Sequence, residues 1–135
     1  GRCRRCLEQA AAVSVSGLRL HPVYRVTVFV PPAHLQALKR GILAVDDLAA
    51  GGYAHGMWES APGREQFRAL PGTASVVGEV GELVSEPSVR LEFCLPRGVP
   101  GDRARLQRVL DQGIAAHHPW NSPAVFVEAL EFATP

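Results

Sequence analysis

Two strand-then-helix units, separated by a long middle segment, constrain the fold of this chain more than any other feature. Residues 23–30 (VYRVTVFV) are rich in β-branched and aromatic side chains and end at Pro31-Pro32, which predicts a strand. Apolar residues then recur at spacings of three and four, which predicts an amphipathic helix of about 15 residues that starts at the prolines. These apolar residues are Leu35, Leu38, Ile42 and Val45.

The second unit begins at residues 89–95, where apolar and polar side chains alternate as in a half-buried strand. Asp102 is a candidate N-cap for a helix whose apolar stripe runs to residue 114. A last strand is predicted over residues 124–132. Each of these elements is bounded by Gly or Pro, so the unit is predicted from local patterns alone.

The middle segment, residues 53–88, is broken by Gly and Pro into short pieces. We predict a hairpin of residues 53–60 and 65–70 across Ala61-Pro62-Gly63-Arg64, and another short strand at 75–80. The glycines of Val77-Gly78-Glu79-Val80-Gly81 predict a bulge or a close backbone approach, because no phosphate-loop pattern surrounds them.

This order of elements predicts an α+β fold, a ferredoxin-like βαβ-βαβ sandwich with an extra β-hairpin projecting from its middle. Residues 22–135 are expected to form this single domain. Residues 1–21, rich in Arg, Ala and Ser, are expected to be a flexible leader or a remnant of processing or expression.

Composition excludes several classes of partner. The net charge of +1 provides no field to attract nucleic acid, and no apolar run approaches the roughly 18 residues that span a bilayer. Three cysteines do not make a disulfide framework, so we expect a reducing, cytoplasmic location, or an organelle if the leader is a transit remnant. Cys3 and Cys6 have the CxxC spacing of half a zinc site or a redox pair, but further ligands and the usual context are missing.

The stretch HHPWNSP, residues 117–123, poses a choice between a site and a turn. Two adjacent histidines leaving a helix point about 100° apart, so His117 and His118, with or without His55, form a poor divalent-metal site. Two prolines stop a helix and favour extended backbone, so we prefer a rigid turn and leave a ligand-contacting rim and a metal site as alternatives.

A second cluster lies near residue 55. Strand alternation would put Tyr53 and His55 on one face and Trp58 on the other. Aromatic side chains of this kind are favoured at subunit contacts, and a small-molecule cleft is the sharper alternative. If a ligand binds, we expect it at a cleft between subunits. The expected ligand-contacting residues are Tyr53, His55, Trp58, His118, Trp120 and Asn121.

Five motifs in one order resemble the GlnB/CutA-like domain of the Nif3 (NGG1-interacting factor 3) family, which is found inserted in larger proteins or free-standing. The similarity covers residues 23–132, although an acidic pair and a Cys of the family pattern are replaced, by Asn121-Ser122 and Gly56. The chain therefore resembles a divergent member. The matching stretches are Val30–Leu35, Gly51–Trp58, Gln66–Gly72, Val77–Gly81 with Arg90–Glu92, and Ala116–Val125.

This resemblance implies a ferredoxin-like fold that assembles as a homotrimer. The expected function is a non-catalytic ligand-binding or regulatory module without a cofactor, although whether the chain has activity stays open. Two alternatives remain: an accessory domain of a Nif3-type metal-dependent hydrolase (a GTP cyclohydrolase type 2 homologue), and a CutA-like protein that binds a divalent metal.

Overall fold

The computed structural model describes residues 17–135. The predictions for Cys3 and Cys6, and most of the predicted leader, lie outside these residues. Strand β1 spans Arg19–Val30, so it begins inside the segment that the sequence assigned to the leader. Within the described residues no helix is long and apolar enough to cross a membrane.

The first strand–helix unit has the predicted form. After β1 the chain turns through a short 3-10 helix, η1 (Pro32–His34), into helix α2 (Leu35–Val45). Proline is well placed at the start of this turn because the first N–H groups of a helix have no partner within it. The apolar stripe of α2 is buried as predicted, with Leu38 and Ile42 fully inaccessible.

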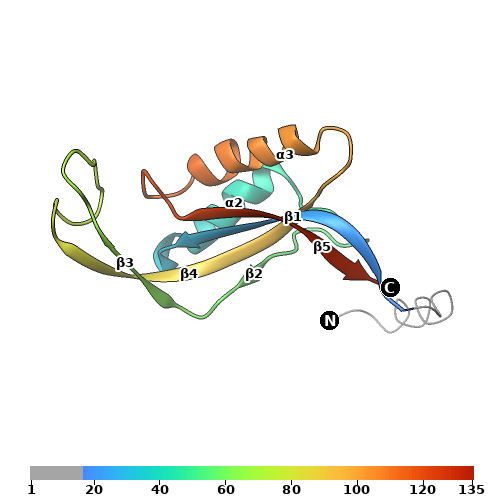
Figure 1. Ribbon diagram of the computed structural model, residues 1–135, viewed down its shortest axis with the longest axis horizontal. Coiled ribbons are helices and arrows are strands. Elements are labelled where there is room, and N and C mark those ends of the chain that lie inside the picture. The colour runs from blue at the N-terminus through green and yellow to red at the C-terminus, as the bar shows by residue number, and fades with distance from the viewer. Residues whose placement is uncertain (1–16) are drawn as a thin grey trace.

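One antiparallel sheet carries the rest of the fold, in the strand order β2-β4-β1-β5. Its long strands are β1, β4 (Leu83–Pro96) and β5 (Val125–Thr134), and both helices lie on the same face (Figure 1). Each helical segment connects two strands that are not neighbours in the sheet. β4 lies between β1 and β2, which α2 connects, and β1 lies between β4 and β5, which α3 connects. This is the ferredoxin-like topology, so the predicted fold class is confirmed.

The middle segment differs from the prediction. Strand β2 (Trp58–Glu59) and strand β3 (Gly63–Arg68) do not pair with each other; each pairs with a different part of β4. The predicted hairpin of residues 53–60 and 65–70 is therefore wrong. The physical reason is length: 14 residues of β4 provide more ladder hydrogen bonds than a local hairpin could.

The ribbon that does project consists of β3, the first half of β4 and the loop of residues 69–82 between them; we call it the hairpin (Figure 1). Residues 75–80, predicted as a strand, lie in turns of this loop, which is also a correction. Gly78 has a φ of +74°, and an added Cβ would lie 2.3 Å from Val84. The predicted close backbone approach is therefore present.

The burial pattern of β4 changes phase where the hairpin meets the sheet. Val84 and Ser88 are buried in the hairpin half, whereas Val89, Leu91 and the following odd positions are buried in the sheet half. Two consecutive buried residues, Ser88 and Val89, mark the change. Strict alternation breaks at this point, and one strand thus serves two different packing surfaces.

The second helix unit begins at Gly101, which occupies the N-cap position with a φ of +78°. Asp102, predicted as the cap, is instead the first residue of helix α3 (Asp102–Arg108), where its carboxylate accepts the N–H of Gly98 at 2.7 Å. The helix continues as a π-helix, η2 (Val109–Ala115). Residues 117–123 then form the predicted turn into β5.

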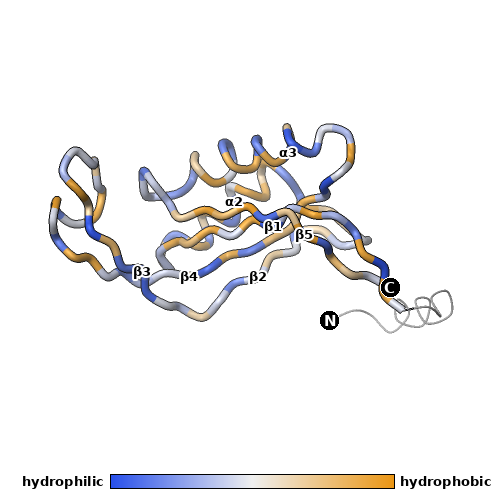
Figure 2. The backbone as a smooth tube through the Cα atoms, viewed as in Figure 1, coloured by the Kyte–Doolittle hydropathy of each residue, from blue (hydrophilic) through white to orange (hydrophobic). Residues whose placement is uncertain are grey.

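The core lies between the helices and one face of the sheet. Alternate residues of β1 and β4 meet the apolar stripes of α2, α3 and η2, and each fully buried aliphatic side chain contributes about 1.5–3 kcal/mol. Figure 2 shows these apolar positions along the adjoining strands and helices. The least accessible side chains are Val26, Val28, Val30, Leu38, Ile42, Leu91, Leu95, Val109 and Ile114.

Two glycines let helix α2 and the π-helix η2 approach closely. An added Cβ on Gly113 would lie 3.3 Å from the Cα of Ile42, and one on Gly41 would lie 2.3 Å from the ring of His117. The end of α2 is tied to α3 by an ion pair, in which Arg105 donates to the carboxylate of Asp46 at 2.6 and 2.8 Å. These contacts fix how the helices lie over the sheet.

Candidate functional site

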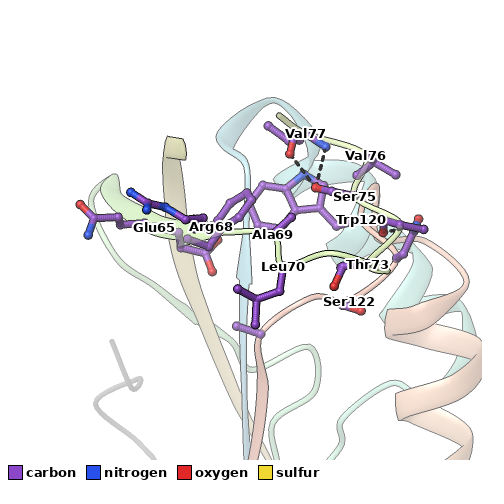
Figure 3. A pocket seen from close by; sticks show the side chains of 15 residues that line it. Glu65, Arg68, Ala69, Leu70, Thr73, Ser75, Val76, Val77, Trp120 and Ser122 are labelled. Carbon is purple, nitrogen blue, oxygen red and sulfur yellow. Dashed lines mark hydrogen bonds between the residues drawn. The ribbon is translucent and has the colours of Figure 1, made fainter. Parts of the chain in front are cut away.

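A cleft of about 540 Å³ lies where the hairpin meets the turn of residues 117–123. We call it the hairpin-base cleft (Figure 3). One wall comes from β3 and the loop that follows it, and the other from the turn, so segments some 50 residues apart in the sequence face one another. Its principal side chains are Glu65, Phe67, Ser75, Trp120, Asn121 and Ser122.

Aromatic rings and one carboxylate dominate the cleft. The rings of Phe67 and Trp120 meet edge to face, with 5.6 Å between their centroids. Glu65 is held next to them by the hydroxyl of Ser88, which donates at 2.9 Å. The amide of Asn121 donates to the carbonyl of Ala74 at 3.2 Å and links the turn to the hairpin loop. Such a surface suits a flat apolar group that carries a hydrogen-bond donor.

His118 fixes the position of Trp120 through a hydrogen bond to its backbone N–H. Its Nε2–H donates to the carbonyl of Phe29 at 2.7 Å, while its Nδ1 accepts the backbone N–H of Trp120 at 3.0 Å. This arrangement requires the neutral ring with its proton on Nε2. Burial lowers the pKa of His118 below its usual value, against the opposing effects of the Phe29 carbonyl and the nearby carboxylate of Glu65.

His117, the other histidine of the predicted pair, has a different role. Its Nδ1 lies 2.9 Å from the carbonyl of Gly113, and its ring covers Gly41 of α2. The two rings thus contact different elements. Within residues 17–135, no three His, Cys, Asp or Glu side chains come together as a set that could hold a metal ion.

The second predicted cluster is not part of this cleft. Tyr53 lines a separate groove of about 680 Å³ at the other end of the molecule, between the 50–53 loop and the paired ends of β1 and β5. We call it the distal groove. His55 is exposed in a loop with a φ of +61°, and Trp58 lies on β2 with the Arg90 guanidinium 4.8 Å from its ring centre. Of the six predicted residues, the structure brings together His118, Trp120 and Asn121.

Among residues 17–135, no element covers the sheet face opposite the helices. By the strand register, alternate residues of β1, β4 and β5 share this face, and Trp58 joins them opposite Glu92. We call it the open sheet face. At its centre Arg25 donates to Glu128 at 3.0 Å, and Glu92 accepts the hydroxyl of Thr27 at 2.9 Å. Exposed aromatic side chains flank these ion pairs, namely Trp58, Phe126 and Phe132.

Sequence reasoning did not single out Glu65 or Ser75 for the cleft. The signal that could have pointed to Glu65 is its alternation with Phe67, which puts both side chains on one side of β3. The wall that these residues form depends on the pairing of β3 with β4, which no local pattern specifies.

Comparison with known proteins bears on the fold. No protein-family profile matches the sequence, and no curated protein is similar enough to match. Among solved structures, a Bacillus cereus protein related to NIF3 matches with a TM-score of 0.63 and 22% identity, over 92% of this chain and 31% of that one. The Staphylococcus aureus protein SA1388 matches with a TM-score of 0.51 and 13% identity, over 90% of this chain and 26% of that one.

This chain thus spans about a third of the length of the NIF3-related protein. Both identities are below a quarter, so the likeness concerns the three-dimensional arrangement of the elements. The order of the motifs in the sequence and this structural match agree with each other. The predicted resemblance is therefore confirmed at the level of the fold: the chain has the fold of part of a Bacillus cereus protein related to NIF3.

Proposed function

We propose that this chain is a non-catalytic binding module that assembles into a homotrimer and takes a small ligand at the hairpin-base cleft. The observation that carries this proposal is a sheet with helices on one face only. Its other face bears aromatic residues that have no cover within the described chain. Two further features support the rest of the proposal. The hairpin-base cleft supports ligand binding, and the hydrogen bonds of His118 support a non-catalytic role.

The open sheet face supports self-association. Phe126, Phe132 and Trp58 are 56%, 48% and 51% exposed, which is high for large aromatic side chains on one surface. The charged residues at the centre of this face already pair within the chain, so burying it would leave no unpaired charge. A second copy that presents the same neutralised surface is therefore a suitable partner.

A closed ring of three is favoured over an open chain of subunits. The hairpin extends beyond the sheet with unpaired strand edges, and β5 has an unpaired edge along its ten residues among those described. Proteins normally cover such edges. Rotation about a threefold axis would bring each hairpin against a neighbour and close the assembly, whereas a linear contact would leave one end uncovered.

The hairpin-base cleft supports ligand binding. It combines two aromatic rings with a carboxylate and a carbonyl-bound amide, the mixture of apolar area and a few fixed polar groups that is typical of small-molecule sites. One wall is the projecting hairpin itself. Assembly and ligand occupancy would therefore affect the same segment, which is the basis for a regulatory role.

The bonding of His118 supports a non-catalytic role. Both of its ring nitrogens already hold backbone partners, so it is not available to take a proton from a bound molecule. The burial of the ring also disfavours its protonated form. Its position instead fixes Trp120 at the wall of the cleft.

A second candidate is an accessory domain of a larger enzyme. The specific observation in its favour is that the chain matches less than a third of the NIF3-related protein's length. In that case the binding behaviour would be the same, and catalysis would depend on other segments. The CutA-like metal-binding alternative and the cytoplasmic location stay predictions from the sequence.

Sedimentation equilibrium of the 135-residue chain tests the assembly. We expect a trimer at micromolar concentration and a shift to monomer in Phe126→Asp, but not in Arg108→Asp on the outer surface of α3. A stable wild-type monomer would remove the proposed trimer. Circular dichroism would establish that each variant keeps the fold.

Fluorescence of Trp120, isolated in the Trp58→Phe variant, tests the ligand site. We expect saturable changes with small aromatic amines and none after Phe67→Ala. Zinc titration of the same variant separates the metal-binding alternative. Submicromolar, stoichiometric zinc binding that His118→Ala abolishes would contradict the non-metal proposal.

A further inference from the structure

One wall of the hairpin-base cleft combines a carboxylate with an aromatic ring. Glu65 and Phe67 alternate along β3, so their side chains leave the same side of the strand, towards Trp120 of the turn (Figure 3). Arg68 also borders the cleft, but its side chain leaves the other side of β3 and is exposed. The side of β3 that faces Trp120 therefore carries a carboxylate and no basic residue.

The carboxylate of Glu65 has unused hydrogen-bonding capacity. Its Oε2 accepts the hydroxyl of Ser88 at 2.9 Å, and Ser88 is only 4% exposed, so the group is held in place. Its Oε1 accepts no hydrogen bond from residues 17–135, and none of their basic side chains forms an ion pair with it. Since an ionised carboxylate can accept about four hydrogen bonds, a ligand with N–H groups would complete its set.

The charges of the two segments that form the cleft favour a cation. Residues 63–88 carry four carboxylates against two guanidinium groups, and the turn of residues 117–123 contains no Asp, Glu, Lys or Arg. Glu86 lies directly opposite Glu65 in the β3–β4 ladder, so two like charges share one face of the hairpin. A positive group next to Glu65 would relieve this repulsion, whereas an anion would increase it.

The aromatic rings of the cleft add a second attraction for a cation. Phe67 and Trp120 are both partly exposed, and the neutral ring of His118, 5.8 Å from that of Trp120, adds no positive charge. An ammonium group near the face of an aromatic ring is attracted by the negative potential of its π electrons. A bare metal ion is less well served, because no three His, Cys, Asp or Glu side chains of residues 17–135 come together.

We propose that the ligand of the hairpin-base cleft is a small organic ammonium ion, a protonated amine attached to a flat apolar group. The ammonium group donates to the carboxylate of Glu65, and the apolar part lies against Phe67 and Trp120. The volume of the cleft, about 540 Å³, lies within the range of small-molecule sites. This inference rests on the proposed ligand site and names the chemical class that the site takes.

Three probes that share a phenyl ring and differ in charge test this class of ligand. At neutral pH phenethylamine is a cation, 2-phenylethanol is uncharged and phenylacetate is an anion. In the Trp58→Phe variant, we expect the fluorescence of Trp120 to report that phenethylamine binds about tenfold more tightly than 2-phenylethanol, with phenylacetate the weakest. Glu65→Gln should abolish this preference, because the amide keeps an acceptor for Ser88 but loses the charge.

The matched control is Glu79→Gln, which removes the same charge at an exposed position of the hairpin loop outside the lining of the cleft. We expect this variant to keep the preference, and circular dichroism establishes the fold of each variant. If phenethylamine binds no more tightly than 2-phenylethanol, or if the two Gln variants behave alike, the ammonium contact with Glu65 is wrong and the proposed ligand site stands. If none of the three probes changes the fluorescence, both proposals fail.

Discussion

The close contact between Gly41 and His117 predicts that Gly41→Ala destabilises the protein when His117 is present and stabilises it when His117 is replaced. Gly41 lies in the interior of α2, where replacing Gly by Ala normally stabilises a helix by about 1 kcal/mol. Here the new methyl group would lie 2.3–2.7 Å from three atoms of the imidazole ring. The ring would have to leave its bond to the Gly113 carbonyl, and overpacking of this kind costs about 1–3 kcal/mol.

We therefore expect Gly41→Ala to lower the free energy of unfolding by up to about 2 kcal/mol in the wild-type background. In a His117→Ala background the clash is absent, and the same substitution should raise the free energy of unfolding by about 1 kcal/mol. Urea unfolding of the four proteins, followed by circular dichroism, gives the coupling directly. If Gly41→Ala stabilises both backgrounds equally, His117 does not cover this position and the argument fails.

Three further predictions concern the pH dependence, the partly buried ion pair of Asp46 and Arg105, and the hairpin loop. The pKa of His118 is lower in the folded chain than in the unfolded one, so the unfolded chain takes up a proton first as the pH falls. The free energy of unfolding should therefore decrease below about pH 6.5, by at most about 1.4 kcal/mol per pH unit. Unfolding curves of His118→Asn at several pH values should lack this decrease. Asp46→Asn should cost about 2–3 kcal/mol because it leaves Arg105 without its charged partner, and a double-mutant cycle with Arg105→Met that gives no coupling would contradict this. Gly78→Ala should cost at least about 1 kcal/mol more than Gly72→Ala, since both have positive φ but only the first meets a side chain; thermal unfolding of the two variants compares them.

Local patterns predicted most of the elements correctly. The spacing of apolar residues in α2 and the alternation in the second half of β4 depend only on the geometry of a helix or a strand. The same holds for the turn of residues 117–123, because proline restricts its own backbone and that of its predecessor. These features gave the ferredoxin-like order of elements, and the resemblance of the motifs pointed to the same fold.

The candidate site was predicted only in part. Of the residues expected to contact a ligand, Trp120 and Asn121 line the hairpin-base cleft and His118 contacts Trp120, whereas Tyr53 lies in a groove at the other end of the molecule. Spacing along the chain does not tell which segments meet in space. The opposite wall of the cleft belongs to β3, whose partner was predicted incorrectly.

The sequence by itself determined where the two helices and the long strands form, because φ/ψ preferences and apolar periodicity act over a few residues. Only the tertiary structure decided that β2 and β3 both pair with β4, that His117 covers a glycine of α2, and that the aromatic clusters separate. These outcomes depend on contacts between distant residues, in which burial of a whole surface outweighs the preference of any short segment.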